Sequence, residues 1–215
     1  MTQVIPGSEP DASSDLQLRL TRLIGLRLCH DLGGLAGTIG NALEMLGDAG
    51  AEASDLAQDA ADMLRRRLLL WRALLGGSEA RTLGSVFGLL KGQVAGGRAH
   101  LDIGDLPEAA PLSETLVPVL LTGLLLGGEA LPRGGTVRIG GDLAREIAIL
   151  PIGAGANWNP LLVRDLAGAP LPRDITSRDA LALWFCMSAR AAELRLSLAL
   201  TAGDGPAPLL ISLPA

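Results

Sequence analysis

The sequence predicts an α+β protein in which a long helical hairpin precedes a layered α/β domain. Two observations lead to this prediction. Residues 13–46 and 53–75 repeat apolar side chains at helical spacing, and the turn sequence GDAG lies between them. After Gly77 the pattern changes, and helical stretches alternate with short strands. We therefore expect a hairpin domain at residues 13–77 and an α/β domain at residues 78–215.

Each predicted helix of the hairpin has a regular face. On the first helix, spacings of four, three, four and three residues align Leu16, Leu20, Leu23, Arg27 and His30. On the second helix, the stripe consists of Leu56, Ala60, Met63, Leu64, Leu68, Trp71 and Leu75. A single hairpin leaves one apolar side uncovered, and pairing two hairpins in a four-helix bundle covers it. The sequence therefore predicts a homodimer.

The α/β domain is predicted from the order of its elements. The expected helices cover residues 81–95, 112–130 and 160–168, and a further helix passes into a strand within 177–203. The expected strands lie within residues 98–104, 131–141, 145–153 and 207–214. Helices and strands alternate while the last strands meander, which favours a mixed sheet with helices on one face.

Composition excludes several classes of function. The net charge is −5, and the one basic cluster, Arg65–Arg67, is interpreted as a solvated helix face, which argues against nucleic-acid binding. The longest apolar run, Leu116–Leu126, is too short to span a bilayer, and the N-terminus lacks the features of a signal peptide. Cys29 and Cys186 match no metal-ligand spacing, so we expect a reduced, cytoplasmic protein without a metal or membrane segment.

The stretch from Leu28 to Leu46 combines a helical pattern with four glycines and one of the two histidines, His30. A glycine in an exposed helix interior costs about 1 kcal/mol relative to alanine. Gly33, Gly34 and Gly37 lie three, four and seven residues after His30, on the face of that histidine. The alternative to a functional role is that His30 is a structural helical histidine that packs against neighbouring residues or caps a helix. We interpret His100 as structural, Trp71 as a core residue, and Cys29 as a small buried apolar residue.

The order of these segments resembles the catalytic core of a bacterial sensor histidine kinase, in which a dimerising hairpin carries a phospho-accepting histidine ahead of a nucleotide-binding domain. The stretch EALPRGGTVRI resembles the sequence that follows the kinase asparagine box. Counted back from Pro132, the box asparagines fall on Thr122 and Leu126, and Leu126 cannot ligate magnesium. Pro151 stands where the next box has its aspartate, and the segment SRDALALWFCMSARAAEL lacks the glycine-rich lid. The resemblance therefore implies a kinase-like fold that does not bind ATP.

The chain also resembles the ChpT-type histidine phosphotransferases, dimeric proteins with a kinase-like fold that do not bind ATP. The residues that match the motif of this family are Cys29, His30, Asp31, Leu32, Gly37, Ile39, Asn41, Leu43, Glu44 and Leu46. The sequence departs from that motif at Gly33, Gly34 and Leu35, where Ile-Ser-Pro is usual.

This resemblance implies a phosphorelay role in which His30 takes a phosphoryl group from an aspartyl phosphate and passes it to another receiver domain. The implied partners are receiver domains of a hybrid sensor kinase and of response regulators, and magnesium is expected on the receiver, with no cofactor on this chain. A neutral imidazole is a good nucleophile. The residues expected around His30 are Arg27, Asp31, Gly33, Gly34, Gly37, Thr38 and Asn41.

The expected role differs from residue to residue. The glycines leave room for the receiver to approach. Asp31 is a candidate to orient the imidazole, although adjacent helical residues point about 100° apart. Arg27 either meets the phosphoryl charge or is simply solvated, and Thr38 and Asn41 either bond near the site or bond to their own backbone.

Two other functions remain compatible with the sequence. One is an active histidine kinase with divergent ATP boxes. The other is a non-catalytic dimeric scaffold that binds receiver domains.

Overall fold

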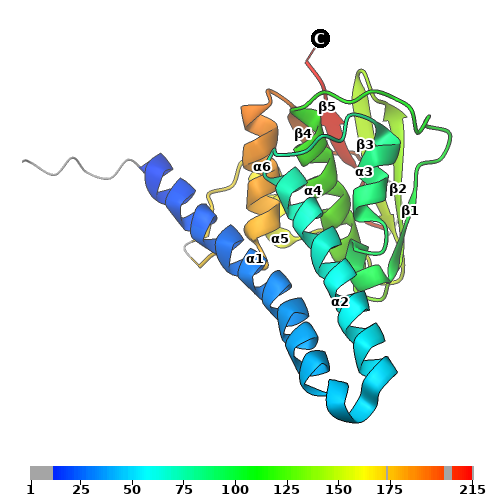
Figure 1. Ribbon diagram of the computed structural model, residues 1–215. Helices are drawn as coiled ribbons and strands as arrows, with labels where there is room; N and C mark the ends of the chain where they lie inside the picture. The colour runs from blue at the N-terminus through cyan, green and yellow to red at the C-terminus, as the bar shows by residue number, and fades with distance from the viewer. Residues whose placement is uncertain (1–11, 173, 201–204, 215) are drawn as a thin grey trace, which may run out of the picture.

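The structure is a computed structural model that describes residues 12–172, 174–200 and 205–214. A helical hairpin leans against one side of an α/β body, and its tip projects beyond that body (Figure 1). The predicted α+β class, with a hairpin ahead of a mixed sheet, is confirmed.

The hairpin consists of α1 (Ala12–Glu44) and α2 (Leu46–Leu74). After one helical turn at the start of α2, Gly50 adopts a φ of +48°, and the chain reverses there. A positive φ carries no penalty at glycine, because it has no Cβ. The glycine-containing turn predicted between the two helices is therefore confirmed.

The α/β body follows in the predicted order. Its helices are α3 (Leu83–Leu90), η1 (Val94–Gly97), α4 (Leu116–Glu129), α5 (Pro160–Leu166) and α6 (Ala180–Ala191). Its strands are β1 (Ala99–Asp102), β2 (Gly135–Asp142), β3 (Glu146–Ile152), β4 (Arg195–Leu198) and β5 (Leu209–Ser212).

Two predicted helices are shorter than the sequence suggested. The helix expected at residues 81–95 ends at Leu90, because Gly92 has a φ of +73° and breaks the helical path. The helix expected at 112–130 begins at Leu116, because the preceding residues are held in a turn in which the Ser113 hydroxyl accepts the Leu116 N–H.

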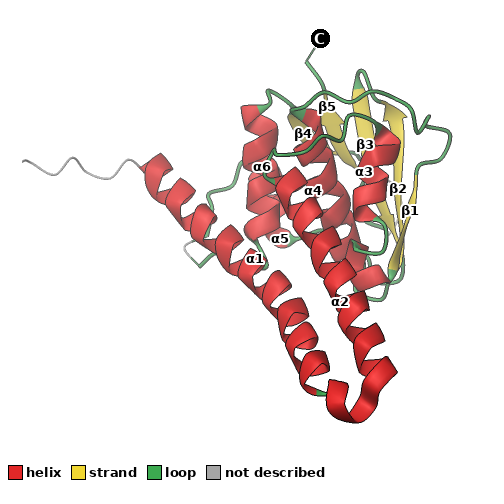
Figure 2. Ribbon diagram, viewed as in Figure 1, coloured by secondary structure: helices red, strands yellow, loops and turns green. Residues whose placement is uncertain are grey.

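The five strands form one sheet in the order β1-β2-β3-β5-β4, with β1 parallel to β2 and the other pairs antiparallel. Alternate residues of the central strands are buried beneath the helices: Val137, Ile139, Ile147, Ile149, Leu209 and Ile211. The helices cover one face of the sheet, as predicted (Figure 2). Helix α4 packs closely on this face, since a Cβ at Gly123 or Gly127 would lie within 2.8 Å of Ile149 or Val137.

One apolar core joins the hairpin to the α/β body. Leu20 and Ile24 of α1 and Leu70 and Leu74 of α2 belong to the same buried cluster as α4 and α6. The Trp184 indole on α6 also donates a hydrogen bond to the Leu74 carbonyl at 3.1 Å. The half of the hairpin formed by the N-terminal part of α1 and the C-terminal part of α2 is therefore fixed on the helical layer. The tip extends away from that layer (Figure 1).

The part of the chain that the structure describes contains no helix with the length and apolar character needed to cross a membrane.

Candidate functional site

His30 lies on α1 where the hairpin leaves the shared core. Its side chain is 90% exposed, which is inconsistent with a histidine that packs in the interior. The Nδ1 atom lies 3.6 Å from Oδ1 of Asp31, so the two adjacent side chains turn toward each other. This arrangement leaves Nε2 as the ring nitrogen directed away from the carboxylate.

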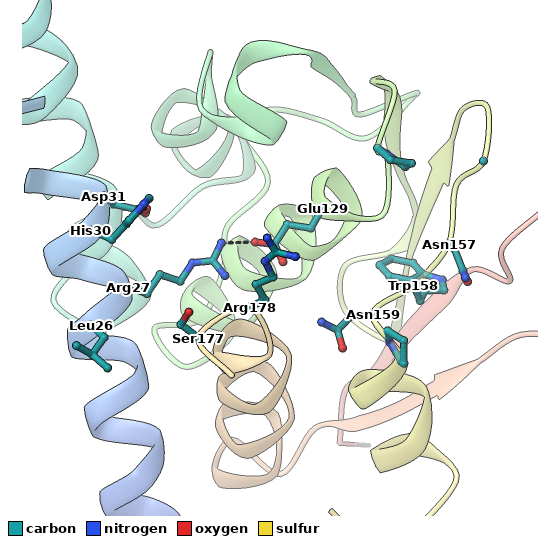
Figure 3. A pocket seen from close by; sticks show the side chains of 13 residues that line it. Leu26, Arg27, His30, Asp31, Glu129, Asn157, Trp158, Asn159, Ser177 and Arg178 are labelled. Atoms are coloured by element: carbon teal, nitrogen blue, oxygen red, sulfur yellow. Dashed lines mark hydrogen bonds and ion pairs between the residues drawn. The ribbon is translucent and has the colours of Figure 1, made fainter. Parts of the chain in front are cut away.

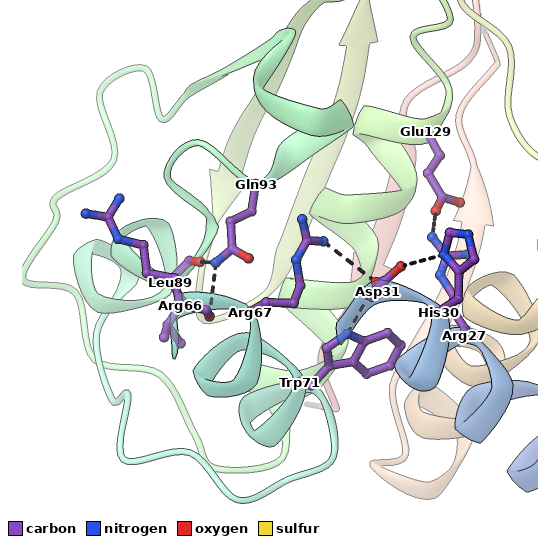
Figure 4. A network of polar contacts seen from close by, with 9 residues as sticks. All are labelled: Arg27, His30, Asp31, Arg66, Arg67, Trp71, Leu89, Gln93 and Glu129. Carbon is purple, nitrogen blue, oxygen red and sulfur yellow. Dashed lines mark hydrogen bonds and ion pairs between the residues drawn. The ribbon is translucent and has the colours of Figure 1, made fainter. Parts of the chain in front are cut away.

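Two residues of α2 contact the side chain of Asp31. The Trp71 indole N–H donates to Oδ2 at 3.3 Å, and a guanidinium nitrogen of Arg67 lies 3.7 Å from the same oxygen (Figure 4). The Asp31 side chain is 23% exposed, much less than that of His30. Trp71 is a core residue as predicted, but its indole nitrogen also belongs to the site.

Arg27 forms an ion pair and hydrogen bond with Glu129 at the end of α4. Burial raises the pKa of Glu129 above its usual value, and the Arg27 charge and hydrogen bond oppose this rise. The carboxylates of Asp31 and Asp179 add to it. Arg27 is therefore not simply solvated: it bridges α1 to the α/β body one turn before His30.

Two hollows flank His30. The first, which we call the α1 cleft, has a volume of about 890 Å³ and separates α1 from the loops of the α/β body (Figure 3). It is lined by Leu26, Arg27, His30, Asp31, Glu129, Pro132, Gly155, Asn157, Trp158, Asn159, Pro160, Ser177 and Arg178. Polar side chains from three separate segments thus face the imidazole across this cleft.

The second hollow, which we call the basic groove, has a volume of about 390 Å³. It is lined by His30, Asp31, Gly34, Leu35, Met63, Arg66, Arg67, Lys91, Gly92 and Gln93. Three of these side chains are cationic, so the groove is suited to an acidic surface on a partner.

The glycines beside His30 are not required by packing within this chain. A Cβ built at Gly33, Gly34 or Gly37 meets nothing within 4 Å. All three positions are exposed, and Gly34 lines the basic groove together with His30. The surface beside the imidazole therefore carries no side chain at these three positions, although there is space for one.

Other predictions for α1 have mixed outcomes. The Thr38 hydroxyl donates to the Gly34 carbonyl at 3.1 Å, so it bonds to its own backbone. Asn41 is exposed, one turn beyond the glycines. The prediction that Cys29 is buried is wrong: its thiol is exposed, because the residue before His30 falls on the free side of α1. The prediction of a solvated basic triplet fails at Arg67, which pairs with Asp31.

The positions that correspond to the kinase boxes are occupied by core residues. Thr122 is fully buried, and its hydroxyl donates to the Pro118 carbonyl at 2.6 Å. Leu126 is 1% exposed, and Pro151 is buried on the helix-covered face of β3. Among the described residues, these three positions offer no free oxygen to a magnesium ion or a nucleotide.

Comparison with protein families decides the identity of this fold. The family model of the histidine phosphotransferase C-terminal domain matches residues 83–204, which is more than half of the chain. The chain belongs to the histidine phosphotransferase family. It is 27% identical over 210 residues to a protein of Brucella abortus (strain 2308) named protein phosphotransferase ChpT, covering 87% of this chain and 93% of the relative.

A solved structure described as a bacterial phosphotransferase has the same fold. It superposes with a TM-score of 0.70 at 24% identity and covers 97% of this chain and 99% of its own. The similarity of fold therefore extends beyond residues 83–204 to the helical hairpin.

Several residues that line the hollows beside His30 were not predicted from the sequence, namely Arg67, Gln93, Glu129, Ser177 and Arg178. For Arg67 a signal existed, because it lies seven residues after Ala60 and four before Trp71, on the buried stripe of α2. Glu129 and Arg178 carried no such signal, because each reaches the site through long-range packing.

The raised pKa of Glu129 leads to a prediction about stability. Since its pKa in the folded protein lies above the unfolded value, the folded state binds this proton more tightly. The resulting stabilisation is complete below the unfolded pKa and is lost as the pH rises through the folded pKa. Urea denaturation between about pH 4 and pH 7 is expected to show wild type losing stability relative to Glu129→Gln as the pH rises. The exposed-site variant Glu79→Gln serves as the control, and curves that stay parallel for wild type and Glu129→Gln would contradict the prediction.

Proposed function

We propose that this histidine phosphotransferase carries phosphoryl groups between aspartates of receiver domains in a phosphorelay, through His30 and without ATP. In this proposal the hairpin of residues 13–77 performs the transfer, and residues 78–215 form a degenerate kinase-type domain that helps to hold the partner. The reaction takes place in the cytoplasm on a homodimer.

The observation that carries the proposal is the exposed imidazole between two hollows. His30 is 90% exposed, while its neighbour Asp31 is fixed from α2. The active pocket of a receiver domain is acidic, and the basic groove offers Arg66, Arg67 and Lys91 to such a surface. Gly34 leaves the approach beside the imidazole open.

The chemistry requires mainly positioning and charge neutralisation. Nε2 of His30 attacks the phosphorus of the aspartyl phosphate, the N–P bond forms, and the P–O bond to aspartate breaks. The leaving carboxylate keeps the electron pair, and Asp31 stabilises the Nδ1–H of the phosphorylated ring. The same steps in reverse deliver the group to a second receiver. Magnesium is expected on the receiver, where it would supply charge neutralisation.

ATP independence is supported by the replacement of the kinase boxes. The asparagine positions are filled by the buried Thr122 and Leu126, and the aspartate position by Pro151. Carboxylate and amide oxygens are the ligands that hold magnesium and adenine in the kinases, and these three residues do not supply them.

The exposed side of the hairpin supports a homodimer. Every leucine, isoleucine and methionine from Leu26 to Leu69 is exposed or half-buried in the single chain. On α1, heptad-like spacings of seven, four and three residues align exposed Cys29, Ala36, Gly40 and Leu43. On α2, spacings of four, three and four residues align Ala57, Ala61, Leu64 and Leu68.

These two rows lie on the side of the hairpin away from His30. Cys29 is one residue before His30 and therefore about 100° away around α1. On α2, Met63 lines the basic groove with His30, and Leu68 lies five residues further, about 140° away. We assign the two rows to the seam of a dimeric four-helix bundle. The small residues on α1 permit close approach of the helices, and His30 stays free on the outer surface.

His30→Gln is expected to abolish phosphotransfer. A receiver domain phosphorylated with acetyl phosphate should label wild type, while labelling of His30→Gln should fall at least about a hundredfold because the nucleophile is lost. His100→Gln serves as the matched control and should be labelled like wild type. Labelling of wild type by ATP and magnesium alone would instead identify a kinase, and receiver binding without any labelling would identify a scaffold.

Gly34→Leu is expected to block the receiver without damaging the histidine. A Cβ at this position meets nothing within 4 Å, and leucine has a higher helix propensity than glycine, so the variant should fold. Transfer from the phosphorylated receiver should slow by at least about tenfold, because the side chain intrudes on a near-attack geometry that tolerates little displacement. Labelling by the small donor phosphoramidate should be unchanged. Equal slowing with both donors would contradict the access role of this glycine.

The dimer seam is tested by a charge at Leu68. Wild type is expected to have the mass of two 22.1-kDa chains in size-exclusion chromatography with light scattering. The dimer dissociation constant of Leu68→Glu should be at least about tenfold higher than that of wild type, because a carboxylate would be buried in an apolar seam. Met63→Glu places the same charge at a similarly exposed position on the other side of α2 and should remain dimeric. A monomeric wild type, or dissociation of both variants, would refute the seam.

A further inference from the structure

We propose that Trp71 and Arg67 are positioning residues that hold the Asp31 carboxylate against Nδ1 of His30, and so present Nε2 as the nucleophile. This inference rests on the proposed transfer through His30. It adds two residues of α2 that act through Asp31 and do not touch the phosphoryl group.

The division of contacts on Asp31 is the first support. Both α2 contacts reach Oδ2, namely the Trp71 N–H at 3.3 Å and the Arg67 guanidinium at 3.7 Å. The other oxygen, Oδ1, faces Nδ1 of His30 at 3.6 Å. Adjacent helical residues point about 100° apart, so this approach requires Asp31 to be directed by something other than its own backbone. At 3.6 Å, the contact between Asp31 and His30 is longer than a hydrogen bond. Catalytic hydrogen bonds are often long in the absence of the reaction partner and shorten when it binds.

The environment of Trp71 is the second support. The ring is 4% exposed and belongs to the core that joins the hairpin to the α/β body. Its N–H therefore has a fixed position and direction. An indole nitrogen is a donor only, so it orients the Asp31 oxygen that it contacts.

Gln93 lines the same groove as Arg67 and has a defined orientation. Its amide nitrogen donates to the carbonyls of Arg66 at 3.2 Å and Leu89 at 2.7 Å, which defines the orientation of the amide. Its Oε1 is buried, has no hydrogen-bond partner among the described residues, and is turned toward the Arg67 side chain (Figure 4). Gln93, Arg67 and Asp31 all line the basic groove. The Arg67 guanidinium thus pairs with the Asp31 carboxylate, and an unpartnered acceptor on Gln93 is turned toward the same side chain.

The consequence for His30 concerns the tautomer. In a neutral imidazole, the hydrogen bond made by one ring nitrogen determines which nitrogen carries the proton. A carboxylate held at Nδ1 favours the Nδ1–H form and leaves the lone pair on Nε2, the nitrogen that an incoming receiver can reach. Loosening of Asp31 would populate the other tautomer, in which Nε2 carries the proton and cannot attack phosphorus.

The experiment measures the His30 tautomer and the transfer rate in the full chain. The protein contains two histidines, so ¹⁵N-histidine spectra at about pH 8 are assigned with His30→Gln. Trp71→Phe keeps an aromatic ring in the core but removes the donor, and Arg67→Met removes the charge at a site that is 29% exposed. Both variants are expected to shift the tautomer ratio toward that of Asp31→Ala and to slow transfer from a phosphorylated receiver about fivefold.

The controls separate positioning from simple stability. Arg65→Gln changes a neighbouring arginine that pairs with Asp62 and should leave both the tautomer and the rate as in wild type. Arg67→Met keeps the test valid if Trp71→Phe folds poorly. Slowed transfer with an unchanged tautomer ratio, or no effect on either, overturns the inference while wild-type transfer through His30 stands. Failure of wild type to accept phosphate refutes the proposed function instead.

Discussion

The apolar core that joins the hairpin to the helical layer is the constraint on which the site depends. Leu70, Trp71 and Leu74 of α2 are buried with α4 and α6. The part of the hairpin that contains them therefore cannot move independently of the α/β body. His30 lies just beyond this anchored region. The same burial that stabilises the hairpin therefore fixes the donor that reaches Asp31 and places the imidazole at the mouth of two hollows.

The positions of the α/β body that the kinase resemblance assigned to nucleotide binding are part of its core. Thr122 satisfies its hydroxyl within α4, and Leu126 is buried among apolar side chains. The α/β body instead forms the side of the α1 cleft that lies opposite α1. The ion pair between Arg27 and Glu129 connects the body to α1. In the proposed function, the α/β body shapes the surroundings of the histidine without taking part in the chemistry.

The two sides of α1 serve different purposes in the proposed dimer. The side bearing His30 and Gly34 is open to a visiting receiver, and the side bearing Ala36 and Leu43 is available to a second copy. Small residues occur on both sides for different reasons. Near the imidazole they leave room for a partner that comes and goes, and along the seam they allow helices to pack closely.

Local patterns in the chain were sufficient to predict the order of helices and strands and the turn at residues 47–50, because apolar periodicity and turn residues act over a few neighbouring positions. The role expected for His30 came instead from the resemblance of its motif to a known family. The contacts that define the site came from the fold. Trp71 reaches Asp31 across 40 residues and Glu129 reaches Arg27 across 102 residues, so no local spacing could reveal either pair. The exposure of Cys29 and the pairing of Arg67 likewise depended on how each helix is rotated when it packs. The helical period places residues on a common face, but tertiary packing determines what that face contacts.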